Sequence, residues 1–305
     1  MQKEWNYSSR VIQGIRISCA ETGTDTKEPP IILLHGLIDS HVTWHKITPK
    51  LSKQRRILIP DLPGHGLSDR ADASYTLEWY SEIIAQWLIE SEIELADFVG
   101  HSLGGGISQM LLLRCPERIR RIALIASGGL GKEISFLLRL ASIPYVVEHL
   151  GQPFMKIATN LICSLGDTGR TREEIRILCA MNGQKGSARV FARTVRDLMN
   201  LSGQRYTFYQ RSHEIENLPP MRVFWGEEDS IIPMNHGRIF SSCVEGTTLV
   251  SFTDCGHSPH HQQPKLLAKA LNEFLNPTED DKGLVLQKRR ADEGKNFTFS
   301  SEAQI

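Results

Sequence analysis

Short apolar runs separated by polar turns recur along this chain. They lie at residues 31–34, 56–59, 98–99, 121–126, 221–225 and 248–252. Each run is continuous and rich in Ile, Val and Leu, which is typical of strands buried on both faces of a parallel sheet. Between several runs, at residues 75–89 and 103–113, the apolar residues recur at helical spacing. The alternation predicts an α/β domain with helices on both faces of a mostly parallel sheet.

The alternation stops between residues 131 and 217, where helical patterns replace the strand-like runs. Thr171 and Glu174 have the spacing of a capping box at a helix start. Another helix is expected at residues 187–201. The residues expected along one face of it are Val190, Thr194, Leu198 and Leu201. We therefore predict an all-helical insertion in the sheet domain.

The end of the chain has a different composition. After Pro277 the sequence is polar and dense in charge, which does not allow a buried core. We predict a disordered tail at residues 278–305, with a recognition tail as the alternative. The sheet domain then comprises residues 1–130 and 218–277, and the insertion comprises residues 131–217.

Composition excludes several classes of function. The chain has 305 residues, of which 40% are hydrophobic and 23% charged, as in ordinary globular proteins. Its 35 basic and 35 acidic residues leave no positive excess for nucleic acid or anionic membranes. The N-terminus lacks the apolar core of a signal peptide, and no run approaches the roughly 20 apolar residues of a membrane span. We expect a cytoplasmic protein that binds neither nucleic acid nor membrane.

The cysteines also indicate a cytoplasmic protein. They are Cys19, Cys115, Cys163, Cys179, Cys243 and Cys255. None forms a C-x-x-C pair, so buried reduced thiols are expected rather than disulfides or a zinc site.

The stretch G-H-S-L-G at residues 100–104 fits the motif G-x-S-x-G. In that motif a tight strand-to-helix turn exposes a serine, here Ser102, and glycines such as Gly100 and Gly104 avoid clashes. The amides at the start of the following helix stabilise negative charge that develops nearby. The alternative is a glycine-rich turn with an incidental serine. The position between an apolar strand and an apolar helix favours a nucleophile.

A serine nucleophile needs a base, and the base needs a third group to orient it. Asp229 follows one predicted strand and His257 follows the next, so the chain order is Ser102, acid, histidine. Glu227 and Glu228 compete with Asp229 for the role of the acid.

Three histidines in G-H-S-P-H-H raise the possibility of a metal site. His257 and His261 are four residues apart, but the three histidines lack an i, i+4 pair within one helix and the companion acidic or cysteine ligands of a zinc site. We therefore expect no metal and no cofactor. His260 and His261 are expected to begin a final helix that continues from Pro264.

Acyl transfer also needs two amides that bind the developing oxyanion. The amide of Leu103, directly after the serine, is one candidate. The loop L-L-H-G-L-I supplies the amide of Leu37 as the other. Gly36 permits an unusual backbone there, and His35 either braces the loop by hydrogen bonding or only packs against it.

The sequence resembles the α/β-hydrolase fold superfamily. The motifs are L-L-H-G-L, D-L-P-G-H-G-L-S-D, G-H-S-L-G-G-G, W-G-E-E-D-S-I-I-P and D-C-G-H-S-P, in this order over residues 31–259. The resemblance implies an eight-stranded, mostly parallel sheet, a helical cap at the insertion and a Ser102, Asp229 and His257 triad. It also favours Asp229 over its two neighbours.

The nucleophile narrows the expected chemistry. Haloalkane dehalogenases and epoxide hydrolases of this superfamily carry Asp at the position of Ser102, so an acyl-serine mechanism is expected here. The expected substrate is a small or medium hydrophobic carboxylic ester, or a related acyl compound, reached under a mobile lid. The apolar stretches at residues 136–147 and 155–165 fit either an acyl pocket or, in our preferred interpretation, buried helix faces.

Three alternatives stay open. Hydrolases that cleave C–C bonds of meta-cleavage products share the triad, but often carry Trp after the histidine, where this chain has Ser258. Cofactor-free haloperoxidases and perhydrolases use the same residues. A receptor that binds ligands without turnover is also compatible with the fold.

Overall fold

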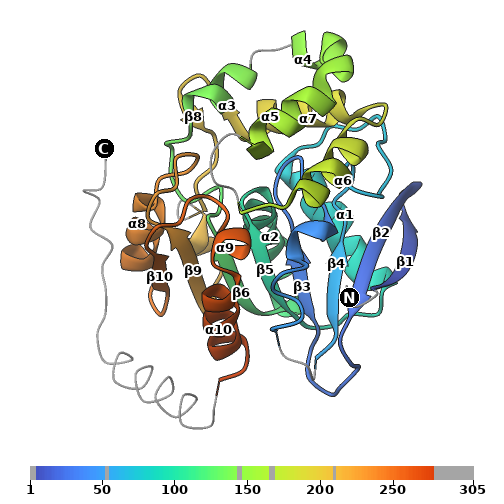
Figure 1. Ribbon diagram of the computed structural model, residues 1–305. Helices are drawn as coiled ribbons and strands as arrows, with labels where there is room; N and C mark the ends of the chain where they lie inside the picture. The colour runs from blue at the N-terminus through green and yellow to red at the C-terminus, as the bar shows by residue number, and fades with distance from the viewer. Residues whose placement is uncertain (1–4, 52–54, 143–145, 165–168, 209–210, 278–305) are drawn as a thin grey trace.

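An eight-stranded sheet forms the centre of the molecule (Figure 1). The structure is a computed structural model and describes residues 5–51, 55–142, 146–164, 169–208 and 211–277. In spatial order the strands are β1 (Asn6–Ile12), β2 (Ile15–Thr22), β4 (Ile57–Pro60), β3 (Ile31–Leu34), β5 (Ala96–His101), β6 (Ile119–Ile125), β9 (Met221–Gly226) and β10 (Thr248–Phe252). The pairs β1–β2 and β2–β4 are antiparallel and the others are parallel. The mostly parallel sheet is confirmed.

The apolar pattern missed the first two strands. All of β1 except its last residue is exposed, so its sequence contains no continuous apolar run. A two-residue turn joins it to β2, with Gln13 and Gly14 at φ values of 50° and 78°. Positive φ at both positions matches the right-handed twist of a hairpin. The opposite edge also differs from the prediction, since only Phe252 of β10 is buried.

Helices cover both faces of the sheet. They are α1 (Leu77–Glu90), α2 (Leu103–Arg114), α8 (Asn235–Cys243), α9 (Pro259–Gln262) and α10 (Pro264–Leu275), with the short 3₁₀ helices η1 (His41–Trp44) and η2 (Pro116–Arg118). Alternate residues of β3 separate the two cores. Ile32 and Leu34 pack in the core that contains α1 and α2, whereas Ile31 and Leu33 pack in the core that contains α10.

The predicted final helix is divided. Gln263, at φ −130° and ψ 53°, separates α9 from α10. Leu266, expected among the apolar residues of that helix, is exposed. The helix expected from residue 75 begins later, because Tyr75 has a φ of 58° and the side chain of Thr76 caps α1.

The insertion lies over one end of the sheet (Figure 1). It contains α3 (Phe136–Ala141), α4 (Val146–Leu150), η3 (Gln152–Phe154), α5 (Met155–Ser164), α6 (Arg172–Asn182), α7 (Ser187–Leu198), β7 (Met199–Asn200), β8 (Gly203–Gln204) and η5 (Ser212–Glu214). The capping box of Thr171 and Glu174 is present at the start of α6. The prediction of an all-helical insertion is wrong, because α7 ends at Leu198 and β7 pairs with β8. Leu201 lies in the exposed turn between these two strands.

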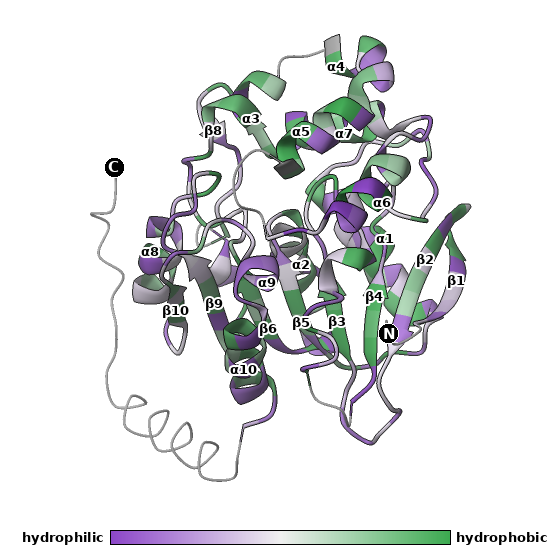
Figure 2. Cartoon of the chain, viewed as in Figure 1, coloured by the Kyte–Doolittle hydropathy of each residue, from purple (hydrophilic) through white to green (hydrophobic). Residues whose placement is uncertain are grey.

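Two helices of the insertion contain hydrophobic residues (Figure 2), and several of these residues are exposed. Phe136 and Leu137 of α3 are 67% and 75% exposed, and Ile157 and Leu161 of α5 are 65% and 54% exposed. We expected buried helix faces here, and that prediction is wrong for these residues.

Three further expectations have mixed outcomes. The predicted tail at residues 278–305 lies outside the described residues. Within the described part of the chain, no helix is long and apolar enough to cross a membrane. None of the six cysteines forms a disulfide, but Cys179 is half-buried and Cys243 is exposed, which corrects the expectation that all are buried.

Candidate active site

Ser102 lies in the tight turn between β5 and α2. Its φ of 52° and ψ of −112° are unusual for a residue with a side chain. The backbone holds it there, since its N–H donates to the carbonyl of Ile125 at 3.0 Å. Its own carbonyl accepts N–H groups of Gly105, Gly106 and Gly128 at 3.1 to 3.2 Å. The half-buried Ser102 thus has the strained turn conformation that the motif requires.

Two glycines make this turn possible by close approach of the backbone. A Cβ on Gly100 would lie 2.5 Å from the carbonyl oxygen of Gly104, and a Cβ on Gly104 would lie 2.2 Å from that of Leu34. Gly106 differs, because the nearest atom to its Cβ position is a methyl carbon of Leu77 at 3.5 Å. Gly100 and Gly104 are therefore needed for the turn, and Gly106 is not.

His257 and Asp229 form a hydrogen-bonded pair. Nδ1–H of His257 donates to Oδ2 of Asp229 at 2.8 Å. The other oxygen of this buried carboxylate accepts the backbone N–H groups of Ile231 and Ile232, at 2.9 Å and 3.0 Å. The carboxylate is thus fixed toward the imidazole.

The two neighbouring acids differ from Asp229 in their surroundings. Glu227 accepts a hydrogen bond from the hydroxyl of Ser251, and both Glu227 and Glu228 are exposed. Among these three candidates, the geometry favours Asp229 as the acid.

His101, which the sequence analysis did not single out, links the serine turn to the histidine loop. Its Nε2–H donates to the carbonyl of His257 at 2.9 Å. Its ring lies 5.0 Å from that of His257 and 4.4 Å from that of His260, between centroids. Burial, together with the adjacent His257, lowers the pKa of His101 to about 3, so the ring is neutral at pH 7. Its only sequence signal is its position directly before Ser102.

The loop after β3, which carries Leu37, lies against the serine turn. The Cβ position of Gly36 is 3.4 Å from Cβ of Ser102. His35 braces this loop, since its Nδ1–H donates to the carbonyl of Gly36 at 2.8 Å and its Nε2 accepts the N–H of Leu62 at 3.0 Å. Of the two expectations for His35, hydrogen bonding fits the geometry.

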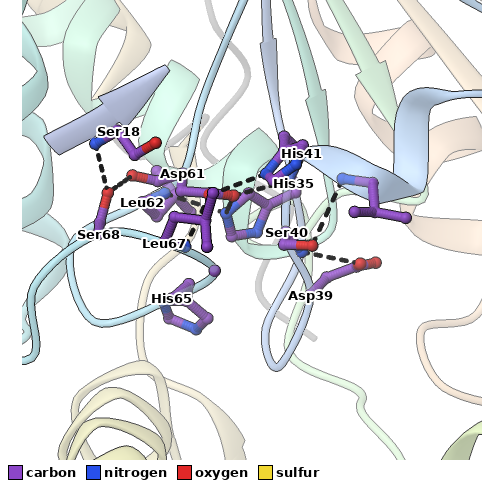
Figure 3. Close-up of polar contacts among 12 residues, drawn as sticks. Ser18, His35, Asp39, Ser40, His41, Asp61, Leu62, His65, Leu67 and Ser68 are labelled. Carbon is purple, nitrogen blue, oxygen red and sulfur yellow. Dashed lines mark hydrogen bonds and ion pairs between the residues drawn. The ribbon is translucent and has the colours of Figure 1, made fainter. Parts of the chain in front are cut away.

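A buried carboxylate completes this brace (Figure 3). Oδ1 of Asp61 accepts the backbone N–H of His41 at 2.7 Å, and Oδ2 accepts Nδ1–H of His41 and the N–H of Leu67, both at 2.8 Å. The backbone carbonyl of Asp61 accepts the hydroxyl of Ser68, which in turn accepts the N–H of Ser18. Asp61 thus ties the D-L-P-G-H-G-L-S-D segment to β2 and η1.

A second buried cluster tests the metal hypothesis. His257 pairs with Asp229, but His260 and His261 lie with Asp39, and one potential ligand atom of each lies within 4.8 Å of the others. The sequence argument that no acidic companion exists is therefore wrong, because Asp39 is distant in the chain. However, Nη2 of Arg170 donates to Oδ2 of Asp39 at 2.5 Å. The guanidinium charge disfavours a metal cation in the same place.

The comparisons with known proteins agree with this architecture. A family model described as alpha/beta hydrolase fold matches residues 29–150. An uncharacterised protein of Mycobacterium tuberculosis is 29% identical over 97% of this chain and 90% of its own length. The 2-hydroxymuconate semialdehyde hydrolase of a Pseudomonas strain is 29% identical over 87% of this chain and 92% of its own length.

Solved structures show the same fold. Cfl2 of Burkholderia cenocepacia has a TM-score of 0.76 at 20% identity, over 89% of this chain and 96% of that one. A meta-cleavage product hydrolase of Pseudomonas fluorescens has a TM-score of 0.69 at 23% identity, over 88% of this chain and 97% of that one. The fold is that of an α/β hydrolase.

Proposed function

We propose that the protein is a serine hydrolase that cleaves a small hydrophobic carboxylic ester through an acyl-serine intermediate. Ser102 is the nucleophile, His257 the base and Asp229 the acid that orients it. The amides of Leu37 and Leu103 bind the oxyanion. The observation that carries the proposal is the strained conformation of Ser102 together with the 2.8 Å bond between His257 and Asp229. No metal or cofactor is needed for these steps.

The proposed sequence of proton transfers starts from the bond between His257 and Asp229. With Nδ1–H bonded to Asp229, the unprotonated Nε2 of His257 accepts the proton of Ser102 as the serine oxygen attacks the carbonyl carbon. The oxyanion forms beside the two amides, and the imidazolium returns its proton to the leaving alkoxide. Water then attacks the acyl-serine in the same way and releases the carboxylic acid, which restores the enzyme.

The insertion, residues 131–217, is proposed to act as the cap over this site. Its position over one end of the sheet (Figure 1) and its exposed apolar side chains on α3 and α5 support a hydrophobic substrate. The reduced cysteines support a cytoplasmic enzyme.

C–C bond hydrolysis is the second candidate. Curated relatives include the 2-hydroxymuconate semialdehyde hydrolase and a 2-hydroxy-6-oxo-2,4-heptadienoate hydrolase of Pseudomonas putida, which is 25% identical. The same triad activates water or serine against a ketone as well as an ester. Ser258 after the histidine is the feature of this chain that favours esters.

The deciding experiment uses p-nitrophenyl acetate, butyrate and octanoate, with 2-hydroxymuconate semialdehyde as the C–C substrate. Wild type should cleave at least one ester faster than 2-hydroxymuconate semialdehyde. Ser102→Ala should lose about 10⁴-fold or more in turnover of that ester. Ester cleavage retained by Ser102→Ala contradicts the acyl-serine mechanism. A wild type that cleaves only the C–C substrate establishes the second candidate, and inactivity on all substrates favours a binding role.

A further inference from the structure

The loop that carries the Leu37 amide contains a strained residue. Ile38 has a φ of 53°, a left-handed conformation that is a genuine outlier for a β-branched side chain. Such a conformation persists only where surrounding contacts hold it. The contacts of Ile38 and of its neighbour therefore decide whether the loop keeps its shape.

Two of these contacts come from the insertion rather than from the sheet domain. Nδ2 of Asn182 donates to the carbonyl oxygen of Ile38 at 2.7 Å. Arg170 donates from Nη2 to Oδ2 of Asp39, the next residue, at 2.5 Å. Both side chains are buried, and Asn182 is only 3% exposed. The strained residue is thus fixed on its carbonyl and on the side chain that follows it.

One face of α6 organises these contacts. Its buried residues are Glu174, Leu178 and Asn182, at i, i+4 and i+8, so they form one stripe. The stripe is polar at both ends, which is unusual for an inward helix face. Asn182 reaches the loop after β3, and Glu174 lies 3.3 Å from Nδ1 of His261 on α9. The same helix face therefore contacts the loop of Leu37 and the segment that follows His257.

Thr43 of η1 lies between Arg170 and the two histidines of α9, and it joins them into one cluster. Its hydroxyl lies 2.9 Å from Nε2 of His260 and 2.8 Å from Nε2 of His261. It also accepts from Nη2 of Arg170 at 3.3 Å. The ring of His260 packs on His101, directly before the serine. The cluster is continuous from the insertion to the reacting groups.

We propose that Asn182 and Arg170 are positioning residues that hold the loop after β3 in its strained conformation and so present the Leu37 amide to the oxyanion. This inference rests on the proposed function for its catalytic consequence. The oxyanion site is then complete only while α6 packs against the loop after β3. Loss of either anchor allows Ile38 to relax, and the amide moves out of position.

The test compares Asn182→Ala with Asn160→Ala, a matched change at an exposed position of α5. On p-nitrophenyl butyrate we expect Asn182→Ala to lower kcat about tenfold with KM changed less than twofold, because a misplaced oxyanion donor acts on the transition state. Asn160→Ala should match wild type in both constants. An unchanged kcat for Asn182→Ala, or a loss confined to KM, overturns the proposal.

A rescue separates positioning from general damage to the fold. Glycine adopts positive φ without strain, so in the Ile38→Gly background the Asn182→Ala change should cost less than threefold in kcat. An equal loss in both backgrounds means that the strained residue is not what Asn182 holds, and it overturns the proposal.

Amide hydrogen exchange of the segment 36–42 gives a readout that does not depend on activity. We expect faster exchange in Asn182→Ala than in Asn160→Ala. Unchanged exchange contradicts the positioning role even if the ester assay fails. Conversely, faster exchange in an enzyme without Ser102-dependent ester cleavage contradicts the proposed function and leaves the anchoring supported.

Discussion

Two buried carboxylates lie near the loop after β3, and they are satisfied in different ways. Asp61 is held by backbone amides and by His41, all from the sheet domain. Asp39 accepts the adjacent N–H of Ser40 and is otherwise held by Arg170, 131 residues away in the insertion. Both have lowered pKa values. Burial opposes ionisation in each case, and it is outweighed at Asp61 by the hydrogen bond from His41 and at Asp39 by the charge of Arg170.

The difference separates stability from function. Asp61 cross-links segments that belong to the sheet domain, so its removal acts on the fold as a whole. The pair of Asp39 and Arg170 connects the sheet domain to the insertion. Its removal therefore changes how the insertion packs on the sheet domain. The predictions that follow test this division, from the largest expected effect to the smallest.

Asp61→Ala should lower the free energy of unfolding by about 3–5 kcal/mol, because it leaves buried donors of His41 and Leu67 without their acceptor. Urea unfolding at pH 7.5 measures the loss. As a control, Asp69→Ala removes a half-exposed carboxylate that pairs with Arg16 and should cost about 1 kcal/mol or less. Equal losses of unfolding free energy for the two variants would show that Asp61 does not have a special role in cross-linking the sheet domain.

Acid should destabilise the protein through buried neutral histidines, among them His65 of the D-L-P-G-H-G-L-S-D segment, whose ring centroid lies 5.3 Å from that of His35. Burial, the largest cause in each case, lowers the pKa of His65 and His101 to about 3 and that of His261 to about 4. The unfolded chain therefore binds more protons between pH 6.5 and pH 4, and stability falls as the pH drops through this range. Each histidine should contribute about 1.4 kcal/mol of loss between pH 7.5 and pH 5.5.

Urea unfolding at the two pH values measures the combined loss of unfolding free energy from the three histidines. His261→Gln should reduce this loss by the contribution of one histidine. A wild-type stability that is the same at pH 7.5 and pH 5.5 would show that these rings are not held neutral.

The double variant Asp39→Leu with Arg170→Met sharpens the comparison most. Replacing a buried ion pair by apolar side chains is often neutral or stabilising, so the urea midpoint should stay at or above that of wild type. Turnover of p-nitrophenyl butyrate should nevertheless fall about tenfold, because the loop loses its anchor. If stability and turnover fall together, the pair is a structural link only and the division fails.

The smallest effect concerns the serine turn. Gly106→Ala should leave activity unchanged and raise stability by about 0.5–1 kcal/mol, since alanine is the better helix former and its Cβ has room. Gly104→Ala serves as the contrast, because its Cβ would meet the carbonyl of Leu34 at 2.2 Å. We expect Gly104→Ala to lose ester cleavage. If Gly104→Ala stays active, the close approach of Gly104 to the Leu34 carbonyl is contradicted.

The sequence predicted what local patterns encode. The central strands, the turn at Ser102 and the order of Asp229 and His257 follow from short motifs whose spacing is set by the chain itself. The hairpin of β1 and β2 was missed because an exposed edge strand has no apolar run.

The cluster around Asp39 was missed for a different reason. Arg170 and Asn182 carry no motif, and their partners become neighbours only when α6 packs on the sheet domain. The strain at Ile38 has no signature either, since isoleucine is an improbable residue for a left-handed conformation. Contacts between distant segments are thus the part of the site that sequence patterns do not contain.

The central claim, that Ser102 is an activated nucleophile, is tested most directly by labelling with a fluorophosphonate and locating the adduct by mass spectrometry. We predict one adduct, on Ser102, that is absent in Ser102→Ala and forms much more slowly in His257→Ala. Failure to label folded wild type, or an adduct on another residue that survives Ser102→Ala, would contradict the account.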